Sequence, residues 1–511
     1  MSEKWGTYKK LHKWPGLIIA FILLYYAISG IFMNHRKLFS GLDLDRKILP
    51  KEYTYKNWNN SALKGNLILS PDSILVYGHI GIWLTDSVFK HYVSFNSGLP
   101  KGSDNRKIFD VHQTADGHLY AASLFGLYAF NRDLKKWYKF DLAADNERFV
   151  GIESIGDTIY AISRSYLFKG KSNGIKTTFS KIELLAPQDY VNKITLFKTI
   201  WQIHSGEIFG LPGQLFVDLL GAITILLSIT GIIYFIFPRW IKHRLKRKLP
   251  SPKIIKANRW SLKWHNKLGA WIFIFLIVLF FTGMFLRPPL LIAIARLEVT
   301  PLKFSHLNQP NPWYDKLRDI LYDGDRKIFL LSTSDGMYFL DEKDLHPKMF
   351  QNQAPVSVMG INSFQPYKNG AFLIGSFSGL FLWNPNQSEI YNFTNGKIYQ
   401  ENVTGRPIGD FKVTGTLTDT HGNLFMVDYD QGVIPMWHNY SFPEMPENIR
   451  KESKMSLWNV CLEIHTGRIF QGLLGLFYIL MVPLTGLLSI TVVFSGYLLW
   501  RRKYKKSQTK L

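Results

Sequence analysis

Histidine is the residue type whose positions in this sequence most suggest chemistry. Four of the fourteen histidines recur at matched positions of an internal repeat. The first matched pair is His12 and His265, 253 positions apart, and a glycine follows each four residues later, at Gly16 and Gly269. A neutral imidazole can bind a metal, and a glycine one turn away on the same helical face leaves room for a macrocycle edge. These four residues are therefore candidates for a cofactor site.

A second matched pair, His204 and His465, lies 261 positions apart in two Ile-His-Ser/Thr-Gly segments. Two histidines outside the pattern serve for comparison. His35 and His243 also stand beside apolar stretches, but residues other than histidine occupy their counterpart positions in the repeat. We rank them as second choices, with His35 the better candidate for the site of His204 and His465.

The elements that carry these histidines are predicted membrane spans. Each supplies about 20 mostly apolar residues, the length that a bilayer core requires. The four spans are Pro15–Met33, Leu215–Phe237, Leu268–Leu286 and Leu473–Trp500. Spans one and three align without a gap, as do spans two and four, so the chain is two copies of one unit: span, polar segment, span. An even number of spans per copy makes these parallel repeats, related by an axis along the membrane normal.

The repeat places the members of each histidine pair at the same depth on opposite sides of a shared axis. Two imidazoles in that arrangement can bind a haem iron, one on each axial side. Histidines at span ends are also ordinary interfacial polar residues, and this alternative remains. A two-histidine metal site is a further alternative, but it has no carboxylate partner in the sequence. The single cysteine, Cys461, excludes thiolate clusters and internal disulfides.

Small residues also recur inside the spans. Their expected role is close helix packing with hydroxyl bonds to the backbone of the same helix. They are Ser29–Gly30, Ser228, Thr230–Gly231, Thr282–Gly283 and Thr485–Gly486. Outside the spans, Gly206 and Gly467 follow their histidines by two residues and could leave room for a bound group.

Positive charge is concentrated at one side of the predicted spans. The formal net charge is +23, and twenty of the lysines and arginines lie in three short segments that together contain one acid, Glu3. Short basic flanks are typical of the cytoplasmic side, so both termini are predicted in the cytoplasm and the two long polar segments outside an inner membrane. Because lipid headgroups explain these cations, we expect the bilayer as a partner and no nucleic acid.

The two outer segments show six β-hairpin patterns, spaced roughly 40–50 residues apart, as propeller blades are. We expect them to combine into one six-bladed propeller, with two separate open β-domains as the alternative. The predicted fold class is therefore membrane α-helical with an all-β extracytoplasmic part. The predicted divisions are 1–38 (stub and span one), 39–200 (β), 201–240 (span two), 241–264 (basic loop), 265–288 (span three), 289–459 (β), 460–500 (span four) and 501–511 (basic tail).

At its spans the chain resembles the PepSY-associated transmembrane family, which includes bacterial iron-regulated membrane proteins and ferric-siderophore reductases. The resemblance rests on Leu11–Gly16, on Trp264–Gly269, and on the boxes at His204 and His465. It implies two b-type haems, held by the two histidine pairs, that pass electrons across the membrane to a ferric siderophore or other iron chelate. The outer segments show no clear PepSY domain, which leaves the substrate open.

We expect a transmembrane haem protein, and a possible ferric-chelate reductase, whose electron donor is another protein or a membrane quinol. The cytoplasmic segments are too short for a nicotinamide or flavin domain and contain no glycine-rich fingerprint. No catalytic residue can be assigned. The alternative is a non-enzymatic, membrane-anchored propeller that senses or binds a ligand. A transporter is a weaker possibility, because the spans contain almost no charge.

Overall fold

The protein is described by a computed structural model that covers residues 2–142, 148–356, 360–400, 409–437 and 440–508. Residues 509–511, the end of the predicted basic tail, lie outside the described residues, as does Met1. The chain divides into two compact units, and each unit contains segments from both repeats. The helical unit comprises Met1–Phe39, Asn192–Gln309 and Trp458–Leu511, and the β unit comprises Ser40–Val191 and Pro310–Leu457.

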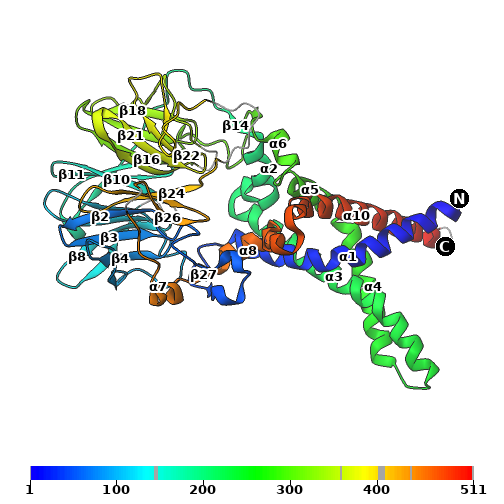
Figure 1. The fold of residues 1–511 in the computed structure, drawn as a ribbon. Helices are drawn as coiled ribbons and strands as arrows, with labels where there is room; N and C mark the ends of the chain where they lie inside the picture. The colour runs from blue at the N-terminus through cyan, green and yellow to red at the C-terminus, as the bar shows by residue number, and fades with distance from the viewer. Residues whose placement is uncertain (1, 143–147, 357–359, 401–408, 438–439, 509–511) are drawn as a thin grey trace. The chain divides into compact units, whose positions relative to one another are not determined.

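The helical unit consists of long apolar helices and shorter helices separated by brief breaks (Figure 1). Its helices are α1 (Ser2–Asn34), α2 (Leu196–Ser205), α3 (Gly210–Lys246), α4 (Pro252–Trp271), α5 (Phe273–Met284), α6 (Leu290–Ile294), α8 (Leu457–His465), α9 (Gln471–Leu474) and α10 (Tyr478–Gln508). The short strands β14 (Ile194–Thr195) and β15 (Glu298–Val299) pair within this unit.

Three helical stretches are long and apolar enough to cross a membrane: Trp5–Asn34, Glu207–Lys246 and Arg468–Lys503. Helices α4 and α5 give a fourth span if they are counted together, although they are bent by 70°. Three of the four predicted spans are therefore present as continuous stretches, and the third is broken at Ile272. Its repeat counterpart α1 continues through Pro15 without a break. The predicted basic loop is mostly helical, because α3 extends to Lys246 and α4 begins at Pro252.

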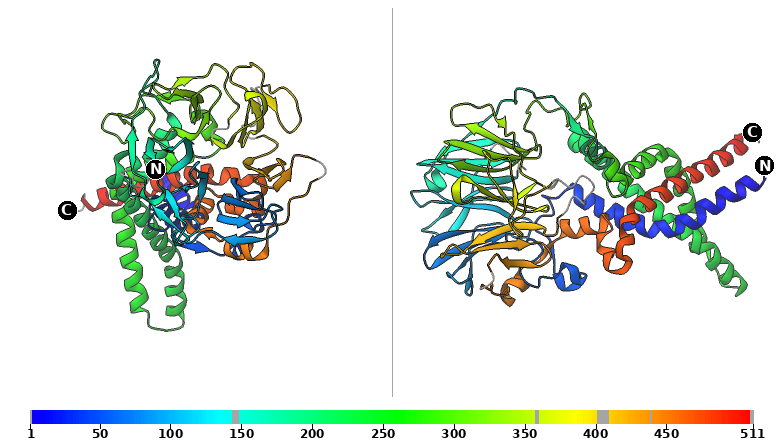
Figure 2. Two further views of the ribbon diagram at one scale, coloured as in Figure 1. Left: turned by 90° about the vertical axis from the view of Figure 1, so that its left-hand side faces the viewer. Right: turned by 45° about the horizontal axis from the view of Figure 1, so that its top comes forward.

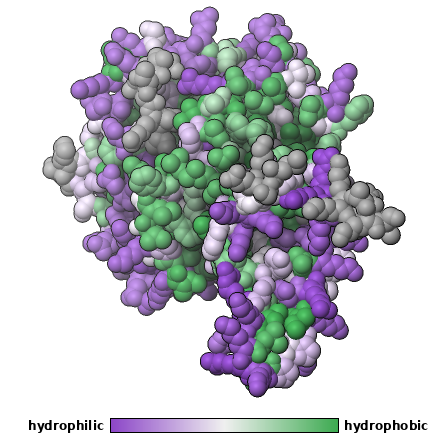
Figure 3. Space-filling model, turned by 90° about the vertical axis from the view of Figure 1, so that its right-hand side faces the viewer, coloured by the Kyte–Doolittle hydropathy of each residue, from purple (hydrophilic) through white to green (hydrophobic). Residues whose placement is uncertain are grey.

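The spanning helices expose many large apolar side chains. Ile18 is 65% exposed, Ile274 59% and Leu476 80%. Figure 3 shows hydrophobic side chains gathered over much of one face of the molecule, with hydrophilic side chains around them. Exposed apolar surface of this extent would be costly in water and favourable against lipid tails. The helical unit thus has the surface of a membrane-embedded domain.

Six small antiparallel sheets make up most of the β unit. In every sheet the strands pair in chain order. The first three sheets are β2 (Gly65–Ser70), β3 (Ser73–Gly78), β4 (Gly81–Thr85) and β5 (Tyr92–Ser94); β6 (Ile108–Gln113), β7 (Leu119–Ser123), β8 (Gly126–Asn131) and β9 (Lys136–Lys139); and β10 (Phe149–Ile155), β11 (Thr158–Ser163), β12 (Leu167–Lys171) and β13 (Phe179–Ile182).

The second half of the chain supplies the other three sheets (Figure 2). They are β16 (Leu317–Asp323), β17 (Ile328–Thr333), β18 (Met337–Asp341) and β19 (Lys348–Met349); β20 (Ile361–Pro366), β21 (Phe372–Ser376), β22 (Gly379–Trp383) and β23 (Tyr391–Asn392); and β24 (Val413–Thr418), β25 (Leu424–Asp428) and β26 (Gly432–Pro435). Outside the sheets lie helix α7 (Glu447–Glu452) and a two-stranded pair, β1 (Asp43–Leu44) with β27 (Met455–Ser456).

Each of the six predicted hairpins is present, and it forms the second and third strands of one sheet. The second strand of every sheet is buried at all positions or at all but its first, which is why its apolar pattern is clear. The strand before each hairpin carries a register shift. In five of the six sheets it lies near the start of that strand, for example between Ile108 and Asp110 in β6 and between Leu317 and Asp319 in β16, and in β2 it lies near the end. The first and last strands of the sheets were not predicted.

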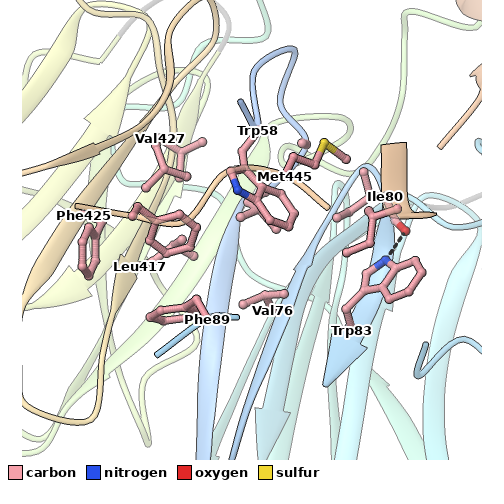
Figure 4. Close-up of a cluster of buried hydrophobic side chains, with 14 of the residues drawn as sticks. Trp58, Val76, Ile80, Trp83, Phe89, Leu417, Phe425, Val427 and Met445 are labelled. Atoms are coloured by element: carbon pink, nitrogen blue, oxygen red, sulfur yellow. Dashed lines mark hydrogen bonds between the residues drawn. The ribbon is translucent and has the colours of Figure 1, made fainter. Parts of the chain in front are cut away.

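Five buried clusters join each sheet to the next in chain order. The sixth cluster joins the last sheet to the first (Figure 4). In it Val76 and Trp83 of the first sheet pack with Leu417 and Phe425 of the last, around the fully buried Trp58. Burying a tryptophan side chain contributes several kcal/mol in a well-packed core. The two long segments of the sequence therefore share one continuous core and form a single unit.

Candidate functional site

The structure brings each matched histidine pair together. The ring centroids of His12 on α1 and His265 on α4 are 6.0 Å apart, and the ring planes meet at 74°. The ring centroids of His204 on α2 and His465 on α8 are 6.1 Å apart, with the planes at 58°. All four rings are half-buried. Residues about 250 positions apart thus face each other within the helical unit.

Each of the four imidazoles is fixed through the same ring atom. The Nδ1 atoms of His12 and His265 lie 2.9 Å and 3.1 Å from the carbonyl oxygens of Val492 and Leu227. A carbonyl oxygen only accepts hydrogen bonds, so in the neutral ring Nδ1 must carry the proton. Every hydrogen bond that the four rings make within the described part of the chain uses Nδ1. Nε2 is then the nitrogen with the free lone pair, which is the tautomer a metal ligand needs.

The second pair repeats this arrangement. His204 Nδ1 lies 3.0 Å from the carbonyl oxygen of Leu279, and His465 Nδ1 lies 2.9 Å from that of Tyr26. The carbonyls belong to spanning helices other than the ones that carry the histidines. Spans one and four are thereby tied to each other, as are spans two and three.

A Ser/Thr–Gly pair on the neighbouring helix contacts each ring. The hydroxyl oxygens of Ser29 and Thr230 lie 3.1 Å from Nδ1 of His465 and His265, respectively, and that of Thr282 lies 3.3 Å from Nδ1 of His204. For His12 the pair is Ser495–Gly496, and the Ser495 hydroxyl shares the Val492 carbonyl with the imidazole. Each hydroxyl donates to carbonyls of its own helix one turn earlier.

The glycine of each pair lies directly against an imidazole. A Cβ atom added at Gly496 would lie 2.6 Å from Cε1 of His12, and one at Gly283 would lie 2.8 Å from Cε1 of His204. At Gly30 and Gly231 the corresponding distances are 3.1 Å and 3.3 Å. Glycine is therefore needed here for close approach of a side chain, and its backbone conformation is ordinary helix.

The predicted hydroxyl bonds to the same helix are confirmed at Ser29, Thr230 and Thr282, and these residues have a second role that was not predicted. Three of the predicted pairs position a histidine, whereas Thr485–Gly486 does serve close packing, because a Cβ at Gly486 would lie 2.2 Å from Met284 Cγ. Ser495–Gly496 was missed in the sequence. Ser228 is buried in α3. A Ser/Thr–Gly dipeptide is common to all four contacts, but Thr485–Gly486 has the same sequence pattern and contacts no histidine, so the dipeptide alone does not identify them.

The glycines near the histidines in sequence have other neighbours. Gly16 and Gly269 face Val492 and Leu227, with added Cβ atoms 3.4 Å and 3.8 Å from those side chains. These are the two residues whose carbonyls receive the imidazoles of the first pair. Each of these glycines thus lies beside the contact that fixes its histidine.

Gly206 and Gly467 have a backbone role. Gly206 adopts φ = 80° and caps α2 two residues after His204, and Gly467 adopts φ = 73° at the equivalent place after His465. Left-handed conformations of this kind at a helix end strongly favour glycine. These residues turn the chain sharply from the short helix that carries the histidine into the next span.

The two pairs lie at very different depths. Along α1, His12 belongs to one pair, and Gly30 packs against a member of the other. Eighteen residues of helix separate these positions, a rise of roughly 27 Å, which approaches the thickness of a bilayer core of about 30 Å. The pairs therefore lie near opposite ends of the spanning helices.

Comparison with known families shows to which family the chain belongs. The family described as the PepSY-associated TM region matches residues 4–237 and again residues 233–503, once for each repeat. The chain belongs to this family. Both histidine pairs lie within the matched residues, and each pair joins one histidine from either half. No curated protein sequence matches this member of the PepSY-associated family.

Solved structures offer only distant likenesses. The extracellular domain of a protein described as a hybrid two-component system, BT4673 of B. thetaiotaomicron, is 12% identical with a TM-score of 0.33, and the match covers 76% of this chain and 40% of that one. A protein of unknown function from Bacteroides thetaiotaomicron VPI-5482 is 9% identical with a TM-score of 0.34, covering 77% and 71%. The chain thus spans less than half of the BT4673 domain, and neither likeness bears on function.

The second-choice histidines make different contacts. His35 Nε2 lies 2.6 Å from a carboxylate oxygen of Asp218, whose other oxygen accepts from Asn34 at 2.8 Å. His35 therefore directs Nε2 to an acid of α3. His243 lies in the last turn of α3. Among the described residues, no group of three or more His, Cys, Asp or Glu side chains could hold a metal ion by itself.

Proposed function

We propose that this membrane protein binds two b-type haems, one at His12 and His265 and one at His204 and His465, and passes electrons across the membrane. The separation of the imidazoles supports this proposal. Two metal–imidazole bonds of about 2 Å, with each ring centroid about 1 Å behind its ligating nitrogen, would place the centroids about 6 Å apart. The observed centroid distances are 6.0 Å and 6.1 Å.

The hydrogen bonds at Nδ1 and the glycine contacts support the same assignment. A carbonyl at Nδ1 fixes the tautomer and orientation of a metal-bound histidine and increases its basicity. Glycine behind each ring allows the neighbouring helix to hold that orientation without a clash. A bound haem would supply a one-electron couple between ferric and ferrous iron. The chain would supply ligands at two depths in the bilayer.

The distribution of charge along the sequence supports one orientation of the protein in the membrane. The basic segments around residues 4–13, 239–263 and 501–510 mark the cytoplasmic side, so His12 and His265 would lie near the cytoplasm and His204 and His465 near the outer face. The β unit would then be extracytoplasmic. The acceptor would be a ferric siderophore or other iron chelate, and the donor a membrane quinol or another protein.

We further propose that the β unit is a closed six-bladed propeller. Five four-stranded sheets and one three-stranded sheet pack in chain order, and the buried cluster around Trp58 joins the last sheet to the first. A ring of this kind leaves no sheet unpaired on either face. A propeller in this place gives the protein an outer surface on which an acceptor can bind.

Replacement of each histidine by leucine tests the haem assignment. The purified full-length protein should show a reduced-minus-oxidised b-type band, and each of His12→Leu, His265→Leu, His204→Leu and His465→Leu should remove about half of it. A double variant within one pair should lose no more than either single variant, whereas one variant from each pair together should abolish the band. His35→Leu is the matched control. A colourless wild-type protein with full helical content would exclude the proposal and favour a sensor or binding protein.

A further inference from the structure

The surroundings of the outer histidine pair depart from the symmetry of the repeat. Arg468 stands three residues after His465, where the first repeat has Glu207. Arg287 follows span three where Asn34 follows span one. The second repeat thus has two arginines where the first repeat has an acid and an amide.

These arginines form one cluster with Tyr26, the residue whose carbonyl fixes His465. The ring of Tyr26 lies 5.5 Å from that of His465. The charge of Arg287 acts on the Tyr26 hydroxyl and also on Arg468, and its guanidinium donates a hydrogen bond to Tyr478. We call Tyr26, Arg287 and Arg468 the cationic cluster.

Three polar atoms of the cationic cluster are buried without a hydrogen-bond partner within the described residues. They are Nε of Arg287, Nε of Arg468 and the hydroxyl of Tyr26. Each such atom costs about 1–3 kcal/mol, and a charged group costs more. Arg287 and Arg468 bring two positive charges to the cluster. Glu463 pairs with Arg468 and offsets one of the two positive charges.

The missing partner is an anion with several acceptor oxygens. A carboxylate matches the planar guanidinium fork and can also accept from a phenol hydroxyl. The first-repeat side of the outer pair is less suited to an anion, because it contains the acid Asp218. Asn34 donates both to Asp218 and to the carbonyl of Ser205, the residue after His204. We therefore expect an anion beside the outer pair to bind next to Arg287 and Arg468.

We propose that Arg287, Arg468 and Tyr26 bind the propionate carboxylates of the haem held by His204 and His465. This inference rests on the proposed function, because it assigns residues to that same haem. The three side chains act as positioning residues: they orient the haem about its axial ligands and neutralise its carboxylates. Positive charge near a haem favours its ferrous state. The propionate anions offset the charges of Arg287 and Arg468 and so weaken that effect.

The test compares iron protoporphyrin IX with its dimethyl ester, which lacks the carboxylate charges. Both are loaded into the full-length protein carrying His265→Leu, which lacks the inner site, and the rate of porphyrin loss to excess apomyoglobin is followed by absorbance. Arg287→Gln, and Arg468→Gln combined with Glu463→Gln, should each speed the loss of the acid porphyrin about tenfold or more. Loss of the ester should be unchanged. Glu207→Gln, at the counterpart position of Arg468, is the matched control.

Several results would overturn the inference. Equal acceleration for both porphyrins would indicate a structural role for the arginines, and no acceleration for either would remove them from the site. A defect confined to reduction of an added ferric chelate, with normal porphyrin retention, would assign the cluster to an external anion instead. If the parent protein binds no porphyrin at all, the proposed function fails, which is a separate outcome.

Discussion

Alanine at the four contacting glycines should disturb the histidine sites in a graded order. Ordinary contact with a Cβ atom begins at 3.4 Å. A methyl group would lie 2.6 Å from the ring at Gly496, 2.8 Å at Gly283, 3.1 Å at Gly30 and 3.3 Å at Gly231. The imidazole must then retreat by about 0.8, 0.6, 0.3 and 0.1 Å, respectively, while a ligand site tolerates displacements of about 0.5 Å.

The expected outcome separates the four variants into two groups. Gly496→Ala should lose the haem at His12 and His265, and Gly283→Ala the haem at His204 and His465, with occupancy falling at least about tenfold. Gly30→Ala and Gly231→Ala should keep both haems with shifted spectra. Alanine in a helix is otherwise about 1 kcal/mol more favourable than glycine, so general destabilisation is not expected.

Haem-to-protein ratio and electron paramagnetic resonance of the ferric protein provide the assay. Gly269→Ala serves as control, because its added Cβ would lie 3.8 Å from the nearest side chain. Full and equal haem content in Gly496→Ala and Gly283→Ala would refute the reasoning. So would loss of haem in Gly269→Ala, because the effect would then not depend on contact with an imidazole.

Three further predictions concern other parts of the chain. Thr230→Val should retain the inner haem and change its midpoint potential only modestly in a redox titration, because His265 keeps its bond to a backbone carbonyl. Asp319 has its pKa raised by burial to about 8, so the β unit should lose stability as pH rises from about 4 to 8, by at most about 1.4 kcal/mol per pH unit, and Asp319→Asn should flatten that dependence in denaturant titrations. Trp58→Ala should cost the β unit about 3–5 kcal/mol, measured by chemical denaturation with circular dichroism, and a loss below 1 kcal/mol would contradict the closing core cluster.

The sequence predicted the hairpins and the histidine pairs for physical reasons that did not extend to their surroundings. A central strand such as β7 is buried along its whole length and has a clear apolar pattern. Edge strands such as β5 are mostly exposed, and β19 has two residues, so neither has a pattern to detect. The edge strands therefore could not be predicted from hydrophobic periodicity alone.

The histidine pairs could be predicted because a duplicated sequence implies a symmetric placement. The hydroxyl and glycine contacts could not, because Ser, Thr and Gly are also the ordinary packing residues of membrane helices. Thr485–Gly486 packs against α5, whereas Thr282–Gly283 contacts His204, and nothing in the two dipeptides themselves distinguishes them.

The contact of His12 with α10 keeps the same geometry at the ring as the other three, although it uses residues that the repeat alignment does not match. In the ungapped alignment of spans two and four, Leu227 corresponds to Leu488 and Gly231 to Val492. In the structure the carbonyl that receives His12 belongs to Val492, one turn later, a shift of roughly 6 Å along α10.

The chain between His465 and α10 contains the cause of this shift. The positive-φ glycines Gly467 and Gly475 lie eight positions apart there, with α9 between them, whereas Gly206 and Gly210, at which α3 begins, lie four positions apart in the first repeat. With α10 displaced by a turn, the glycine that contacts the ring is Gly496 rather than the aligned residue. Two different sequence positions thus meet one requirement: a carbonyl for Nδ1 and, four residues on, a residue with no side chain against Cε1. That coincidence is difficult to explain by packing alone, and it follows directly if the imidazole must be held in one orientation.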